Sequence, residues 1–175
     1  MEIEAFATLV IPFIVVAYLG VAIFVHPTRA VLAASLIGGL VMGIINALFD
    51  LLAYYTHIWH YTLNGLILHL PLPFYLTPAL VYGGIAYLLI WRFWRKRGHW
   101  FALALLFGIP LLRAAIDLLG IASNTSYIQF DSALGWLLDI VMWLVMFYAG
   151  VWVFVRLSSL SLDVFKRQQV SSAGS

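Results

Sequence analysis

The sequence predicts an all-α membrane protein built as a bundle of five transmembrane helices. Of its 175 residues, 65% are hydrophobic and only 9% are charged, and the mean hydropathy is +1.04. Soluble domains carry about 25% charged residues, so this chain has too few charges to cover a water-facing surface. A chain of this length forms one domain. The composition therefore excludes a soluble globular domain, a disordered chain and a nucleic-acid-binding protein.

Five apolar stretches are long enough to cross a membrane. A spanning helix needs about 20 mostly apolar residues, because the hydrocarbon core is roughly 30 Å thick. The predicted spans are 5–25, 30–54, 75–92, 101–121 and 132–155. Residues 1–156 then form a single transmembrane domain, and residues 157–175 form a polar cytoplasmic tail. The first span follows an acidic sequence and is too long for a signal peptide, so we expect it to be retained.

The basic residues predict the orientation of the bundle. With five spans, the first, third and fifth spans end on the same side of the membrane. Eight of the nine Lys and Arg residues fall on that side: Arg29, Arg92, Arg95, Lys96, Arg97, Arg156, Lys166 and Arg167. Because Lys and Arg concentrate on the cytoplasmic side, we expect an external N-terminus and a cytoplasmic C-terminus, in the cell inner membrane if the source is bacterial. The same charges favour anionic lipid at the cytoplasmic face over nucleic acid as a partner.

The connection between the second and third spans is unusual. Residues 55–74 are too broken to span the membrane and too apolar for a solvated loop, and Asn64-Gly65 and the two prolines Pro71 and Pro73 interrupt them. We expect an interfacial or re-entrant segment packed over the helix ends.

Metal and cofactor signals are weak. The chain has no Cys, so thiolate metal sites and disulfides are excluded, and it contains no phosphate-binding or nucleotide-binding motif. His57 and His60 have the spacing of two ligands on one helical face, and with Asp50 they could bind zinc. We favour histidines that face headgroups or water, and we predict neither a metal nor a cofactor.

Four ionisable residues fall inside the predicted spans: Asp50, Arg113, Asp117 and Asp139. Each such group costs about 2.5–3.5 kcal/mol on insertion, so it marks either function or tight pairing. Asn46 and Asp50 are four residues apart, as are Arg113 and Asp117, so each pair shares a helix face. Pairing that only fixes the helix packing is the structural alternative for each of them.

The functional interpretation places these residues in one site between the second, fourth and fifth spans. Asp50, Asp117, Asp139 and Arg113 are the candidate catalytic residues, since a neutral buried carboxylic acid donates protons. The interfacial segment would lie above them. The candidate substrate-binding residues are Asn46, His57, Trp59, His60, Tyr61 and Trp143, whose aromatic members could stabilise a carbocation.

A short internal similarity suggests a duplication. Residues 47–52 and 114–119 align at an offset of 67, and both segments carry an Asp near the outer end of a span that runs outward. The second and third spans would then form one unit, and the fourth and fifth spans another unit of the same direction, which is a parallel repeat.

The pattern formed by Asp50, Trp59, Tyr61, Leu70 and Pro71 resembles the lycopene-cyclase-type membrane domain of carotenoid biosynthesis. The resemblance covers about 25 residues and implies a small helical module, sometimes duplicated, that cyclises an isoprenoid by acid initiation. That family usually has acidic residues directly after the Pro, where this chain has Leu72-Pro73-Phe74-Tyr75. The chain would therefore be either a divergent relative that uses another Asp or a non-catalytic one.

Three functions remain open from the sequence. The first is binding of an apolar lipid or isoprenoid near the outer leaflet, with acid-initiated isomerase or cyclase activity as its enzymatic form. The second is a non-enzymatic subunit or scaffold of a membrane complex. The third is an ion or proton pathway, which the lack of ionisable residues in the inner half disfavours. A homo-oligomer and a hetero-oligomer both remain open.

Overall fold

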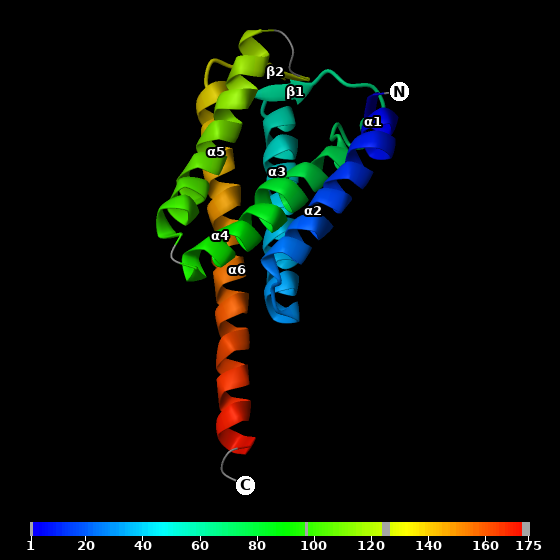
Figure 1. Cartoon of the computed structure of the whole chain (residues 1–175). Helices are drawn as coiled ribbons and strands as arrows, with labels where there is room; N and C mark the ends of the chain where they lie inside the picture. The colour runs from blue at the N-terminus through cyan, green and yellow to red at the C-terminus, as the bar shows by residue number, and fades with distance from the viewer. Residues whose placement is uncertain (1, 97, 124–126, 173–175) are drawn as a thin grey trace.

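Figure 1 shows the computed structural model of the chain, in which long helices pack together beneath a small pair of strands. The structure describes residues 2–96, 98–123 and 127–172. Within them, five helical segments are long and apolar enough to cross a membrane: Ile3–Val25, Arg29–Tyr55, Leu72–Arg95, His99–Ala122 and Gly135–Ser158. The helical bundle with five candidate spans is thus confirmed, and it fits a multi-pass membrane protein.

The first two spans have defined ends. α1 (Glu2–Ala5), the π-helical η1 (Phe6–Val10) and α2 (Ile11–Val25) run on as one span. It ends at His26, whose positive φ of 51° and N–H bond to Ala22 close the last turn. α3 (Arg29–Tyr55) then begins at Thr28, whose hydroxyl accepts from the backbone N–H of Val31.

The third span is composite. It begins with the 3₁₀ turn η2 (Leu72–Tyr75), continues as the π-helical η3 (Thr77–Ile85) and becomes regular only in α4 (Ala86–Arg95). Prolines occupy the first positions of both η2 and η3, where a missing N–H costs little. π-helical turns are often found at functional sites, and η3 lies beside the cavity described below.

The last two helices are longer than the spans predicted for them. α5 covers His99–Ala122 and α6 covers Gly135–Ser172, whereas the sequence predicted a polar tail from residue 157. No Gly or Pro occurs between residues 157 and 172, so nothing there breaks the helix. α6 therefore extends well beyond the other helices toward the C-terminus (Figure 1).

Two short strands modify the all-α prediction. β1 (Trp59–Tyr61) pairs antiparallel with β2 (Ile128–Phe130), and His60 lies opposite Gln129. The predicted interfacial segment thus folds over the helix ends partly as a strand (Figure 1). β2 also delays the fifth span, because the backbone N–H of Asp131 donates to Ile58 before α6 begins at Gly135 rather than at residue 132.

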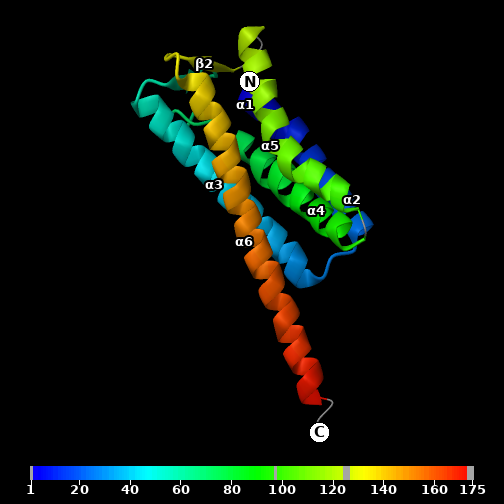
Figure 2. The ribbon, with the colours of Figure 1, turned by 90° about the vertical axis from the view of Figure 1, so that its left-hand side faces the viewer.

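α3 lies at the centre of the bundle. It packs against α6 on one side and η3 on the other, while α5 packs against α4 and α6 (Figure 2). Close approaches require glycine at both α3 contacts: a Cβ on Gly38 would lie 2.7 Å from the carbonyl oxygen of Gly150, and a Cβ on Gly39 would overlap that of Ala79. Tyr87 secures the core by donating to the Phe147 carbonyl at 3.0 Å.

The bundle has two chemically different ends. We call the end with β1, β2 and η2 the strand end; the N-terminus lies there (Figure 1). We call the opposite end, where α2 and α4 finish and α3 begins, the basic end. Its described basic residues are Arg29, Arg92, Arg95, Lys96 and Arg156.

The placement of the strands fits the proposed duplication. Asp50 of α3 and Asp117 of α5 both lie toward the strand end, and each helix is followed by one strand of the pair. Residues 59, 60 and 61 oppose 130, 129 and 128, so the strand that follows each helix lies beside the other. Parallel repeats related by a two-fold axis along the bundle would bring their equivalent strands together in such a pair.

The glycine contact between α3 and η3 gives a stability prediction. Gly39→Ala forces a Cβ against the Ala79 carbonyl, so the two segments must separate at a cost of about 1–3 kcal/mol. We expect a lower thermal unfolding midpoint in detergent, followed by tryptophan fluorescence. Gly20→Ala is the matched control, because nothing lies within 4 Å of its new Cβ. Equal midpoints for the two variants would contradict the packing described.

Candidate functional site

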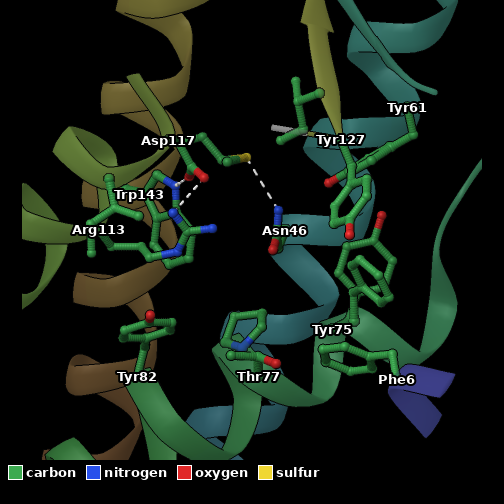
Figure 3. A pocket seen from close by; sticks show the side chains of 15 residues that line it. Phe6, Asn46, Tyr61, Tyr75, Thr77, Tyr82, Arg113, Asp117, Tyr127 and Trp143 are labelled. Carbon is green, nitrogen blue, oxygen red and sulfur yellow. Dashed lines mark hydrogen bonds and ion pairs between the residues drawn. The ribbon is translucent and has the colours of Figure 1, made fainter. Parts of the chain in front are cut away.

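A cavity of about 340 Å³ lies between α3, η3, α5 and α6 in the half of the bundle toward the strand end. Its lining is mixed, with aromatic rings, hydroxyls and one guanidinium group. Figure 3 shows the two polar sides facing each other across the cavity. Arg113, Asp117 and Trp143 form one side, and Tyr61 and Tyr75 form the other.

Asp50 lies directly behind the two tyrosines and is only 2% exposed. Its Oδ2 accepts from the hydroxyls of Tyr61 and Tyr75, each at 2.8 Å, and from Asn46 Nδ2 at 3.3 Å. Its Oδ1 accepts from Trp59 Nε1 at 3.1 Å. A carboxylate offers about four acceptor positions, so four donors match its capacity in number, with three of them sharing Oδ2 and one on Oδ1.

This arrangement suits an ionised carboxylate. Every partner of Asp50 donates, and none is a cation, so the negative charge is stabilised by neutral dipoles alone. Burial, together with the neighbouring Asp50 carboxylate, raises the pKa of the Tyr61 hydroxyl well above its ordinary value, which keeps that hydroxyl a donor. Asp50 thereby acts as an anchor for the surrounding segments.

Asp117 has a different environment. Arg113 pairs with it from one turn earlier on α5, and Trp143 Nε1 of α6 donates to its Oδ2 at 2.9 Å. The guanidinium group of Arg113 also lies 4.9 Å from the centre of the Trp143 ring and 5.9 Å from that of Tyr82. A charged pair is thus held between two aromatic rings at the cavity wall.

Asp139 is the least satisfied of the buried acids. It is 2% exposed, and its Oδ2 has no hydrogen-bond partner among the described residues. Asp117, Arg113 and Asp50 all lie within electrostatic range of it. A buried carboxyl oxygen without a donor is costly when charged, and protonation removes that cost. Among the three acids, the geometry therefore favours Asp139 as a carrier of a proton.

Two hydroxyls face the cavity without a partner in the described part of the chain, those of Thr77 and Tyr82 on η3. Figure 3 places them along a third side, below Arg113 and Tyr75. Free hydroxyls beside a cation provide a place for the polar end of a ligand, while the rings of Phe6, Phe74 and Trp143 provide apolar wall.

The structure brings together most, but not all, of the residues predicted from the sequence. Five of them line the cavity: Asn46, Tyr61, Arg113, Asp117 and Trp143. Asp50 and Trp59 are bonded to each other behind its wall. Asp139 is buried on α6, four residues before Trp143.

The two histidines lie elsewhere. His57 and His60 line a separate hollow together with Tyr54, Tyr55 and Asp131, and His60 Nδ1 lies 2.8 Å from Asp131 Oδ2. His57 sits in a turn with φ of 54° and His60 sits in β1, so they share no helical face. Among the described residues, no group of three metal-binding side chains forms, which removes the basis for a zinc site with Asp50.

Sequence reasoning missed Tyr75, Thr77 and Tyr82. Ionisable groups stand out in a span because they are costly to insert, whereas neutral hydroxyls do not. The available signal was spacing, because Tyr75 and Tyr82 are seven residues apart and so share a helical face. Tyr75 also occupies the segment after Pro71 where the lycopene-cyclase-type pattern has acids, and here it donates to an acid instead.

Comparisons of the chain with protein-family models, curated proteins and solved structures find no match. The resemblance to the lycopene-cyclase-type domain therefore remains a prediction, and function is argued from the site itself.

The Asp50 network predicts a large effect of a small substitution. Asp50→Asn places an amide N–H₂ against donors that already point at the carboxylate, and hydrogen bonds to a charged group contribute about 1.5–3 kcal/mol each. We expect a loss of about 3 kcal/mol in unfolding free energy, measured by thermal or SDS denaturation. Asp131→Asn, on a partly exposed residue, is the control and should change stability little. An unchanged Asp50→Asn protein would show that the carboxylate is not the anchor.

Proposed function

We propose that this protein binds an apolar or amphipathic lipid, most simply an isoprenoid, inside the cavity between α3, η3, α5 and α6. One observation carries the proposal: a cavity walled by aromatic rings lies between candidate membrane spans, with a cation and free hydroxyls on its sides. Such a cavity offers an apolar chain a place beside rings and offers a polar end a few directed groups.

The burial of the three carboxylates favours lipid binding over a scaffold role. Carboxylates that bind a partner subunit would lie on an outer helical surface, whereas Asp50 and Asp139 are each 2% exposed and Asp117 is 7% exposed. Asp117 lines the cavity, Asp50 is bonded to the lining hydroxyls of Tyr61 and Tyr75, and Asp139 lies one helical turn before the lining residue Trp143. The polar residues are thus arranged around an internal space.

The ligand's orientation follows from the lining. Arg113, Thr77 and Tyr82 would hold an oxygen-bearing end, with the guanidinium charge kept in place by Asp117. The hydrocarbon would lie along Phe74, Tyr75 and Trp143. Entry would be sideways from the bilayer, since the cavity lies within the spans.

Acid-initiated isomerisation or cyclisation is the enzymatic form of the proposal, and the environment of Asp139 favours it. A protonated Asp139 would supply a proton that adds to a double bond, and loss of a proton from a neighbouring carbon would end the reaction. No oxidant or reductant is required. Asp117, held ionised by Arg113, would accept the departing proton, and the Trp143 and Tyr82 rings would stabilise the cation between the two steps.

We also propose that the strand end is external and the basic end cytoplasmic. The distribution of Lys and Arg supports this orientation, because the described basic residues other than Arg113 gather at one end. The cavity would then open toward the outer leaflet.

Lipid binding can be tested on the purified protein. Organic extraction and native mass spectrometry should reveal a retained isoprenoid lipid, and Thr77→Val combined with Tyr82→Phe should lower its occupancy about tenfold, because two hydrogen bonds of about 0.5–1.5 kcal/mol each are lost. Tyr148→Phe removes a hydroxyl bonded to Leu106 outside the cavity and should leave occupancy unchanged. Protein that carries only bulk phospholipid, in the same amount in every variant, would argue against the function.

The acid mechanism predicts isotope incorporation. Reconstituted protein incubated in D₂O with an acyclic polyene such as lycopene should add deuterium to carbon, since the added proton comes from an exchangeable group. Asp139→Asn, which mimics the shape of the neutral acid, should keep lipid occupancy and lose at least about a hundredfold of this incorporation, measured by mass spectrometry of the lipid. Asp131→Asn should keep both. Incorporation that survives Asp139→Asn would remove Asp139 from the mechanism.

A further inference from the structure

A second hollow, of about 790 Å³, lies at the basic end between the last turn of α2 and the last turn of α4. It is separate from the lipid cavity and lies at the opposite end of the bundle. Its polar lining comes from the imidazole of His26 and the cations Arg92, Arg95 and Lys96. The flank on the α2 side is apolar, and the proposed function uses none of these residues.

Arg92 builds the floor of this hollow. Its Nη1 donates to the carbonyl oxygens of Phe24 at 2.7 Å and Val25 at 3.1 Å, and its guanidinium carbon lies 4.1 Å from the centre of the Phe24 ring. The last carbonyls of α2 form the negative end of that helix. Arg92 covers these carbonyls, so an anion near the end of α2 meets a cation there instead of bare carbonyl oxygens.

Arg95 and Lys96 provide charge that no described carboxylate neutralises. Arg95 lies over the Trp91 ring at 5.0 Å, and no ion pair forms at either residue within the described part of the chain. The acids whose side chains the structure describes lie away from this end: Glu4, Asp50, Asp117, Asp131 and Asp139. Several cations without a carboxylate partner, gathered around one hollow, attract an anion.

The apolar flank indicates what kind of anion fits. Ile23 is 71% exposed and Phe24 is 52% exposed at the rim, and Val16 and Leu19 continue the same exposed face along α2. These residues belong to a candidate membrane span, so a ligand seated here has a charged head in the hollow and hydrocarbon along α2. A free phosphate would use the cations and leave the flank unused.

We propose that this hollow is a binding site for the phosphate headgroup of an anionic phospholipid. Arg95, Lys96 and the His26 imidazole contact the phosphate, Arg92 lies at the base of the hollow, and one acyl chain runs along Ile23 and Leu19. Basic pockets between helices at a membrane surface bind headgroups of this class. The site is independent of the cavity near Arg113, so either can fail without the other.

The test uses the full chain in nanodiscs or detergent and short-chain phosphatidylglycerol as the probe. Binding is followed by native mass spectrometry and by tryptophan fluorescence. Arg95→Ala combined with Lys96→Ala should weaken binding about thirtyfold, which corresponds to about 1 kcal/mol for each lost cation. Arg29→Ala combined with Arg156→Ala is the matched control, since it removes the same charge from the same end but outside the hollow. It should change binding less than about threefold.

Two further ligands, phosphatidylcholine and inorganic phosphate, test whether the site binds the phospholipid itself. Phosphatidylcholine of equal chain length should bind at least about tenfold more weakly, and inorganic phosphate should not compete at concentrations that saturate the lipid. Equal losses in the two double variants would reduce the effect to diffuse surface charge and overturn the site. Tight binding of inorganic phosphate alone would overturn the lipid as ligand. Equal binding of phosphatidylcholine would overturn the role of charge.

Discussion

The strand end is organised around one buried negative charge. A carboxylate inside an apolar span must have its acceptor positions filled, and Asp50 is satisfied by Asn46 of its own helix, by Trp59 and Tyr61 of β1 and by Tyr75 of η2. The connection after α3 therefore has to fold back onto the helix end. That fold places β1 where β2 can reach it, and it turns Tyr61 and Tyr75 into one wall of the cavity.

The five spans followed from composition because apolar length is a property of each segment alone. The two strands could not be predicted in this way. Each has only three residues, which is too short for an alternating pattern to show, and its partner lies about 70 residues away in the sequence. The same pairing explains the late start of α6 at Gly135. Its extension to Ser172 was missed because polarity was taken as the end of the helix, although polar residues such as Lys, Arg and Gln are good helix formers.

The sequence indicated only the charged members of the candidate site. Asp50, Asp117, Asp139 and Arg113 stood out because charges in a span are expensive. The hydroxyls of Thr77 and Tyr82 carry no such cost, so the charge pattern did not indicate them. The difference between Asp50, with four donors, and Asp139, with an unpartnered oxygen, depends on which side chains pack around each acid. The spacing of residues along one helix does not show which side chains from other segments will surround each acid.

The partners of Asp50 have a consequence for the assembly of the chain. They lie 4, 9, 11 and 25 residues from it along the sequence, so the anion can be satisfied once the chain has entered the membrane as far as Tyr75, before α5 has followed. Asp117 finds Arg113 within one turn and Trp143 after 26 residues. Each half can thus be inserted with its principal acid already paired, while the contacts that join the halves, which include the α3–α6 packing and the β1–β2 pair, must wait for the rest of the chain.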